Sequence, residues 1–148
     1  MKVLVLGGSG FLGSHVCDHL FKLGIHTTIY DLKKTKFKNK NQKMIKGNIL
    51  NLKRLSNTMK KIDTVFNFAG FSDLDSSIKD PLGTAKHNIL GTINILLACQ
   101  KNNVKKFIHA SSIYANTEEG SFYASSKKAA EDYIERYCRN NKINFSIL

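Results

Sequence analysis

Residues 3–13 read Val3-Leu4-Val5-Leu6-Gly7-Gly8-Ser9-Gly10-Phe11-Leu12-Gly13, an apolar run followed at once by closely spaced glycines. The run is typical of a short buried parallel strand, and the residues that follow have the spacing of an amphipathic helix. Glycines between a strand and a helix permit a tight turn and let the backbone approach a pyrophosphate, which the helix N-terminus then attracts. This stretch therefore predicts a dinucleotide site in an α/β fold.

Strands and helices alternate along the whole chain. Strands are expected at 2–6, 27–31, 43–46, 63–68, 106–110 and 144–148, and helices at 10–23, 52–59, 81–102 and 121–141. In the first helix we expect Leu12, Val16, Leu20 and Leu23 to face inward. The alternation implies a doubly wound parallel sheet, a Rossmann fold of about six strands with helices on both faces. No internal boundary divides residues 1–148.

The chain has 148 residues, 42% of them apolar, which is enough for one domain with a core. Its net charge of +12 raises the question of nucleic acid. However, the densest basic run, at 33–46, lies between two expected strands and holds a single aromatic residue, Phe37, with no nucleic-acid-binding motif. We therefore expect a solvated surface loop and no nucleic-acid partner.

The three cysteines, Cys17, Cys99 and Cys138, fall inside expected helices and fit no zinc or disulfide spacing. We expect them at core positions in a reducing compartment, and we expect no metal site. Only four apolar residues precede the glycines, and no apolar stretch approaches membrane-spanning length. The expected location is the cytoplasm, without a membrane partner.

A second motif, Tyr123-Ala124-Ser125-Ser126-Lys127, places a tyrosine and a lysine on one face of the last helix. That face is otherwise apolar, with Ile134 and Cys138, so a lysine there is costly unless it has a partner or a task. A cationic Lys127 would favour the phenolate of Tyr123 for acid/base work on a hydroxyl. The alternative is that Lys127 extends to the surface.

Three further polar residues fall at the carboxyl ends of expected strands, where ligands of such sheets bind. Asp31 would accept hydrogen bonds from adenosine ribose hydroxyls and repel a 2′-phosphate, which favours NAD over NADP. Lys33 and Lys34 lie close enough in sequence to offset that repulsion. Ser111 and Ser112 each offer a hydroxyl for a reacting substrate oxygen.

Together these motifs resemble the extended short-chain dehydrogenase/reductase family, in its NAD-dependent epimerase/dehydratase branch. The resemblance runs in order through 2–13, Asp31, 47–49, 67–70, 81–92, 107–112 and 123–127.

The resemblance implies that Tyr123 is the acid/base at a sugar hydroxyl, that Ser112 is its hydrogen-bonding partner, and that Lys127 holds the nicotinamide ribose. The reaction implied is hydride transfer at C4 of a nucleotide-diphosphate sugar, with NAD as cofactor. The cofactor-binding residues implied are Gly7, Gly10, Phe11, Leu12, Gly13, Asp31, Asn48, Ile49, Phe68, Ala69, Gly70, Asn88, Tyr123 and Lys127.

The helix at 81–102 is apolar almost all round from Ile89 to Cys99. A helix with two apolar faces needs two apolar neighbours, of which the sheet is one. The family commonly dimerises through this helix and the helix from Ser121 to Asn141, so we expect a homodimer.

The departures from the family's pattern restrict the function. The Asp-Glu pair that 4,6-dehydratases carry just after the fifth strand is absent, since Glu118 and Glu119 come too late, and this argues against dehydration. Only ten residues separate Ser112 from Tyr123, and Ser72 stands where well-known 4-epimerases carry a lysine. The carboxyl-terminal substrate domain is missing, so we expect a truncated cofactor-binding half. A reductase of the same family and a non-catalytic dinucleotide-binding module are the alternatives.

Overall fold

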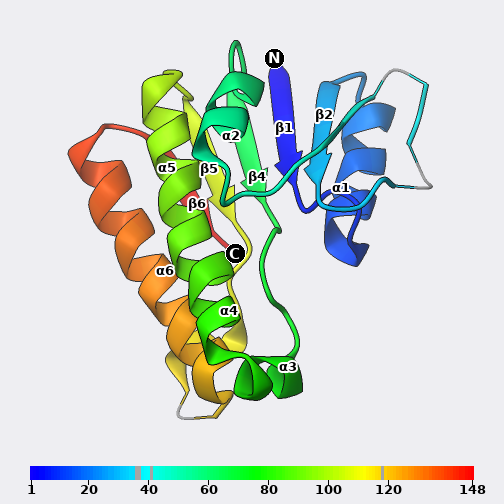
Figure 1. Ribbon diagram of the computed structural model, residues 1–148. Coiled ribbons are helices and arrows are strands. Elements are labelled where there is room, and N and C mark those ends of the chain that lie inside the picture. The colour runs from blue at the N-terminus through cyan, green and yellow to red at the C-terminus, as the bar shows by residue number, and fades with distance from the viewer. Residues whose placement is uncertain (36–37, 41, 118) are drawn as a thin grey trace.

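The computed structural model describes residues 1–35, 38–40, 42–117 and 119–148. Its strands form a single parallel sheet in the order β3-β2-β1-β4-β5-β6, which confirms the predicted doubly wound fold (Figure 1). The order of strands changes direction between β1 and β4, and a ligand crevice is expected outside the carboxyl ends of strands at such a switch point. The strands are β1 Lys2–Leu6, β2 His26–Asp31, β3 Lys43–Lys46, β4 Thr64–Asn67, β5 Lys106–His109 and β6 Asn144–Ile147.

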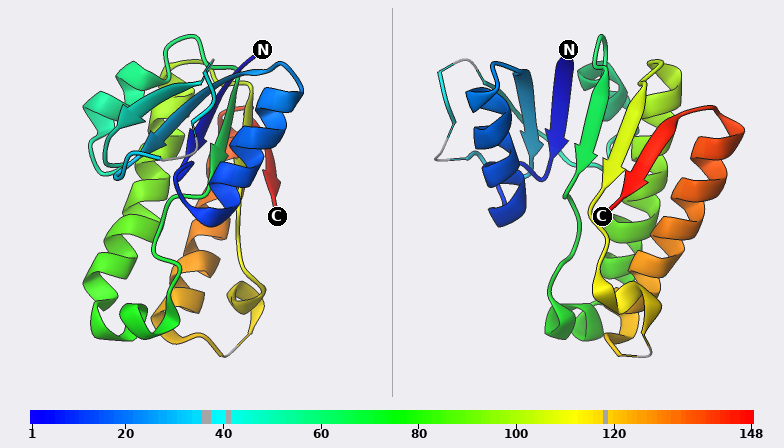
Figure 2. Two further views of the ribbon diagram at one scale, coloured as in Figure 1. Left: turned by 90° about the vertical axis from the view of Figure 1, so that its right-hand side faces the viewer. Right: turned by 180° about the vertical axis from the view of Figure 1, so that it is seen from behind.

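Helices cover both faces of the sheet. One face carries α1, and the other carries α2, α5 and α6, as the view from behind in Figure 2 makes clear. Two short helices, α3 and α4, lie beyond the carboxyl ends of the strands (Figure 1). The helices are α1 Phe11–Lys22, α2 Leu52–Thr58, α3 Leu74–Lys79, α4 Pro81–Ala85, α5 Gly91–Lys101 and α6 Ser121–Asn140.

The helix predicted at 81–102 is interrupted rather than uniform. A π-helical turn, Lys86–Leu90, joins α4 to α5, and such turns frequently mark functional sites. Helix α3 and a 3₁₀ turn, Ile113–Asn116, were also not predicted. Both are too short to show the apolar period on which a helix prediction depends.

The two faces of β1 build two cores. Val3 and Val5 pack with Cys17 on the α1 side, whereas Leu4 and Leu6 belong to the larger core beneath α2, α5 and α6. Successive side chains of a strand point to opposite faces, so the unbroken apolar run of β1 supplies both layers. All three cysteines are buried and unpaired, as expected.

Helix α1 faces the sheet only in part as predicted, since Leu20 is buried and Val16 packs against the core but Leu12 and Leu23 do not. Its buried residues are Gly13, Cys17 and Leu20, whereas Leu12 and Leu23 are 57% and 61% exposed. A Cβ on Gly13 would lie 2.3 Å from the Gly7 carbonyl oxygen. The helix therefore approaches the turn through a glycine, and the neighbouring Leu12 lies on the exposed side of the helix.

The described lysines of the basic segment at 33–46 are exposed, but Asn39 and Gln42 within it are hydrogen-bonded to α1. Gln42 is buried and its side-chain amide donates to the Cys17 carbonyl over 2.7 Å, while the Asn39 amide donates to Asp18 over 2.9 Å. Residues 36, 37 and 41, and Glu118 further on, lie outside the described residues. In the described part of the chain, no helix has the length and apolar character needed to cross a membrane.

Candidate active site

A cavity of about 400 Å³ opens at the carboxyl ends of β1, β2, β4 and β5. It joins the glycine-rich turn to the tyrosine–lysine pair of α6, two motifs that lie more than a hundred residues apart in the sequence. The predicted residues that line it are Gly7, Gly10, Phe11, Leu12, Gly13, Asp31, Asn48, Ile49, Phe68, Ala69, Gly70, Tyr123 and Lys127.

The glycine-rich turn is shaped by contacts that a side chain would prevent. Gly7 has a φ of +74°, and a Cβ there would lie 2.6 Å from the carbonyl carbon of Phe68. Gly10, by contrast, would bring its Cβ near only one described atom, the Gly7 oxygen at 3.3 Å, and it lines the cavity. No described side chain caps α1 after Gly10, so the first amides of the helix remain available to an anion.

Asp31 is held in a fixed orientation at the end of β2. One carboxylate oxygen accepts the amide of Ser9 over 2.9 Å, and the other accepts the amide of Lys33 over 3.0 Å. The carboxylate thereby ties the glycine-rich turn to the residues after β2. Its remaining acceptor capacity lies at the cavity wall, where hydroxyl groups of a ligand can donate to it.

Tyr123 and Lys127 reach the cavity from successive turns of α6, as the sequence predicted. The Lys127 ammonium donates to the Ala110 carbonyl over 2.5 Å, and burial lowers the pKa of Lys127 to about 8 although the Glu131 carboxylate acts in the opposite direction. The Ser111 hydroxyl, which also lines the cavity, donates to Glu131. The lysine is therefore partly desolvated and held by β5 and α6 together.

Two predicted site residues lie outside the cavity lining. Ser112 caps the turn Ile113–Asn116, where its hydroxyl accepts the Tyr114 amide over 3.3 Å. Asn88 is buried in the π-helical turn, and its side chain bonds both backbone groups of Phe71 and the Ser126 hydroxyl. Asn88 thus supports the cavity wall through Phe71, which lines the cavity. After β5, the serine that lines the cavity is Ser111 and not Ser112.

The cavity also contains residues that the sequence analysis had not assigned to it. His87 bonds the Gly83 carbonyl over 2.9 Å and packs against Phe71. The π-helical turn that orients His87 has no signature in the local sequence, so the place of His87 in the cavity could not be predicted. Tyr30 directly precedes Asp31, and its place in the cavity lining could have been predicted from that position. The additional lining residues are Tyr30, Leu32, Gly47, Phe71, Ser72, His87 and Ala110, and Ser111, already a candidate from the sequence, lines the cavity with them.

A buried histidine lies beneath this wall. His109 is 3% exposed, and its Nδ1 lies 3.0 Å from the Asn67 amide nitrogen. The Asn67 oxygen accepts the Ala69 amide, so its nitrogen faces the ring as a donor and the imidazole is neutral with its proton on Nε2. Burial, with a smaller effect of Lys127, lowers the pKa of His109 to about 3. In the described residues, no group of three or more potential ligands is placed to hold a metal ion.

Comparison with known proteins places this geometry among sugar-nucleotide enzymes. A dTDP-D-glucose 4,6-dehydratase of Dictyostelium discoideum is 31% identical over 96% of this chain and 41% of its own length. A UDP-glucose 4-epimerase of Lactobacillus helveticus is 36% identical over 76% of this chain and 36% of its own length. The chain thus spans less than half the length of these two relatives.

The solved structures agree with the sequence matches. The UDP-glucose 4-epimerase of Thermotoga maritima with UDP-glucose superposes with a TM-score of 0.91 at 28% identity, over 99% of this chain and 54% of that one. The Thermus thermophilus UDP-glucose 4-epimerase in complex with NAD gives a TM-score of 0.91 at 27% identity, with the same coverage. A family model for the NAD dependent epimerase/dehydratase family matches residues 3–148, and the chain belongs to that family of enzymes.

Proposed function

We propose that this chain is the cofactor-binding part, with the catalytic residues, of an NAD-dependent nucleotide-sugar 4-epimerase. The observation that carries the proposal is the single cavity that Tyr123 and Lys127 share with the glycine-rich turn. This chain covers about half of each of these two solved relatives. We infer that this half binds the cofactor and that the other half of such enzymes binds the sugar nucleotide.

The residues at the glycine-rich turn fit a dinucleotide. Gly10 leaves room at the cavity wall for a pyrophosphate, and the uncapped start of α1 directs amides and the positive end of the helix dipole toward it. Asp31 is oriented by two backbone amides to accept ribose hydroxyls, and its charge disfavours a 2′-phosphate. NAD is therefore the proposed cofactor in preference to NADP.

Tyr123 is the proposed acid/base residue. Its phenolate would remove the proton from the 4-hydroxyl of the sugar, and the resulting phenol would later return a proton to the same oxygen. When bound, NAD would accept the hydride from C4 and return it to the opposite face of the 4-keto sugar. Lys127, which lines the cavity one helical turn along, would hold the nicotinamide ribose and favour the phenolate electrostatically.

A serine after β5 is the proposed hydrogen-bonding partner of the reacting oxygen. The family's pattern assigns this role to Ser112, while Ser111 is the one of the two that lines the cavity. The loop between Ser112 and Tyr123 is short, and the turn Ile113–Asn116 engages the Ser112 hydroxyl. Substitution of each serine by alanine, followed by a sugar-turnover assay, distinguishes the two assignments.

Epimerisation is favoured over dehydration by the residues that follow the serines. Elimination of water needs an acid beside the leaving hydroxyl. Ile113, Tyr114, Ala115 and Asn116 provide no carboxylate directly after the serines, and the Glu131 carboxylate accepts the Ser111 hydroxyl. A reductase of the same family is the second candidate, and net consumption of NADH during turnover would identify it.

A homodimer is also proposed, through α6 and the helix that contains Ile89 to Cys99. Leu90 and Leu97 on this helix and Tyr133 on α6 are large apolar or aromatic side chains exposed to solvent. Their burial against a second copy would remove that apolar surface from water. The three buried free thiols support a reducing compartment, the cytoplasm, as the proposed location.

The test is the variant Tyr123→Phe. The intact mass of the protein in its source cells is measured first, and the variant is made in the protein of that length. We expect it to bind NAD as the unmodified protein does but to lose interconversion of UDP-glucose and UDP-galactose. Lys86→Gln, an exposed change outside the cavity, serves as the control. Retention of the epimerase rate by Tyr123→Phe would contradict the proposed mechanism.

A further inference from the structure

We propose that a second groove, at the opposite end of the sheet from the active site, binds a compact polyphosphate anion of two or three linked phosphates. The groove is an open depression of about 640 Å³ between α2 and the strands β1, β2 and β3, with Lys2 and Lys43 at the amino ends of β1 and β3. It shares no lining residue with the first cavity. An anion held there would therefore leave the glycine-rich turn free for its own ligand.

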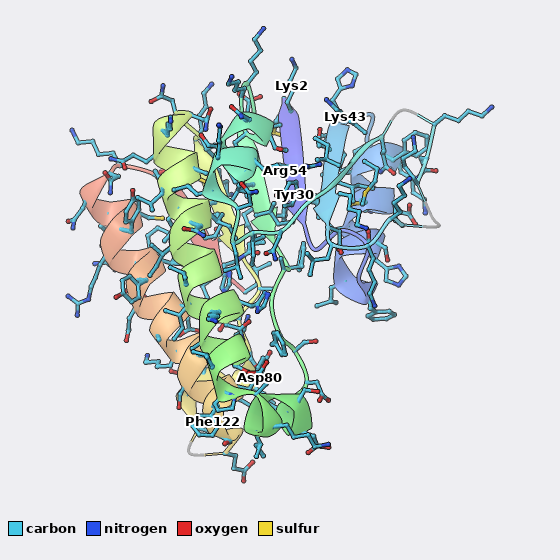
Figure 3. All side chains as sticks on the ribbon, viewed as in Figure 1. Lys2, Tyr30, Lys43, Arg54, Asp80 and Phe122 are labelled. Carbon is cyan, nitrogen blue, oxygen red and sulfur yellow. The ribbon has the colours of Figure 1, made fainter. Side chains whose placement is uncertain are left out.

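Five cationic side chains line this groove: Lys2, Lys43, Lys53, Arg54 and Lys60. They come from β1, β3, α2 and the segment between α2 and β4, so only the folded chain brings them together. Figure 3 shows Lys2, Lys43 and Arg54 at the same corner of the molecule. No aspartate or glutamate is among the described lining residues.

One carboxylate, Asp63, lies beside the Lys2 end of this cluster. Asp63 accepts the backbone amide of Lys2 over 2.8 Å and lies 3.9 Å from the Lys105 ammonium. Its charge also interacts with the Lys2 side chain, so it offsets charge at Lys2 and leaves the other four cations of the groove. None of the five cationic side chains forms an ion pair within the described part of the chain. Like charges gathered in a concave surface create a local potential that attracts a multivalent anion.

Backbone contacts hold the groove in shape. Asn51 caps α2 by accepting the Arg54 amide over 2.9 Å, which fixes the turn that carries Lys53 and Arg54. Lys43 is paired with Thr28 in the register of β2 and β3, so a hydroxyl-bearing residue lies beside an ammonium. The groove is therefore partly organised before a ligand arrives.

The donor set selects phosphate chemistry. A guanidinium binds phosphate oxygens in a bidentate manner, ammonium groups add point charges, and the side chains of Thr28 and Asn57 supply neutral donors. The described lining contains no aromatic side chain on which a nucleobase could stack, which disfavours single-stranded nucleic acid. Two or three linked phosphates match the five positive charges of the groove better than a single phosphate does.

The test is a titration of the ¹⁵N-labelled chain with inorganic triphosphate at about 0.15 M ionic strength, followed by amide chemical shifts. We expect saturable shifts at Thr28, Ile45 and Arg54. In Lys43→Gln/Arg54→Gln the dissociation constant should rise at least about tenfold, because each charge-assisted hydrogen bond contributes that order of affinity. Shifts confined to residues 7–13 would overturn the proposal.

The matched control is Lys22→Gln/Lys86→Gln, which removes the same charge from exposed lysines outside the groove. We expect its dissociation constant to change less than about twofold. Equal weakening in both double variants would mean that net charge alone attracts the anion, and the proposal would fail. If circular dichroism shows that the first variant is unfolded, Lys53→Gln/Lys60→Gln tests the same groove from exposed positions on its other wall.

Discussion

Replacing Gly10 by alanine should separate ligand binding from folding. Gly10 has φ −79° and ψ 178°, which alanine adopts without strain, and its Cβ would meet only the Gly7 oxygen at 3.3 Å. The free energy of unfolding should therefore change by no more than about 1 kcal/mol, because alanine restricts the unfolded chain while the Gly7 oxygen has to shift by a few tenths of an ångström. The added methyl occupies the wall where a pyrophosphate would lie, so NAD affinity should fall at least about tenfold, or about 1.4 kcal/mol.

Gly13→Ala is the informative comparison, because its Cβ would meet backbone that cannot rotate away. The distances are 2.3 Å to the Gly7 oxygen and 2.8 Å to the Gly8 Cα. We expect a loss of about 1–3 kcal/mol or more in the free energy of unfolding, as α1 is pushed from the turn. Urea unfolding and calorimetric titration with NAD measure both quantities for both variants.

Two outcomes would refute this reasoning. If Gly10→Ala unfolds as readily as Gly13→Ala, the close approach of α1 is not what requires glycine at position 13. If Gly10→Ala binds NAD as tightly as the unmodified chain, the cofactor pyrophosphate does not lie against Gly10.

The remaining predictions concern pH. His109 has a pKa of about 3 in the folded chain and 6.5 in the unfolded chain. As the pH drops below about 6.5, the unfolded state therefore takes up a proton before the folded state does. The free energy of unfolding should fall over this range by up to about 1.4 kcal/mol per pH unit. His109→Gln should remove this part of the acid slope in urea unfolding followed between pH 7 and 4, and an unaltered slope would contradict the assignment. Lys127 has a pKa of about 8 folded and 10.5 unfolded, so its contribution to stability rises as pH increases from about 8 to 10.5. The unmodified chain should accordingly gain stability relative to Lys127→Met across that range, and a constant difference between the two unfolding curves would show that the lysine is not desolvated.

Most of the fold followed from short-range pattern. The run Val3 to Leu6 predicted β1, and β3 and the start of α6 were predicted at the residues where the structure has them. The spacing of Tyr123, Ile134 and Cys138 predicted their shared buried face, and all three are buried. Each of these depends on a period of two or of 3.6 residues, which a local stretch of sequence contains in full.

The sequence by itself determined the parallel α/β fold, the glycine-rich turn and the alignment of Tyr123 with Lys127, because local spacing encodes them. Only the tertiary structure decided that Ser111 lines the cavity, that Asn88 supports its wall from behind, and that Leu12 leaves the core. It also decided that lysines from β1, β3, α2 and the segment after α2 converge on one groove beside Arg54. These features arise where segments distant in the chain meet, and there the close approach of backbones and the competition for hydrogen bonds override any periodic pattern.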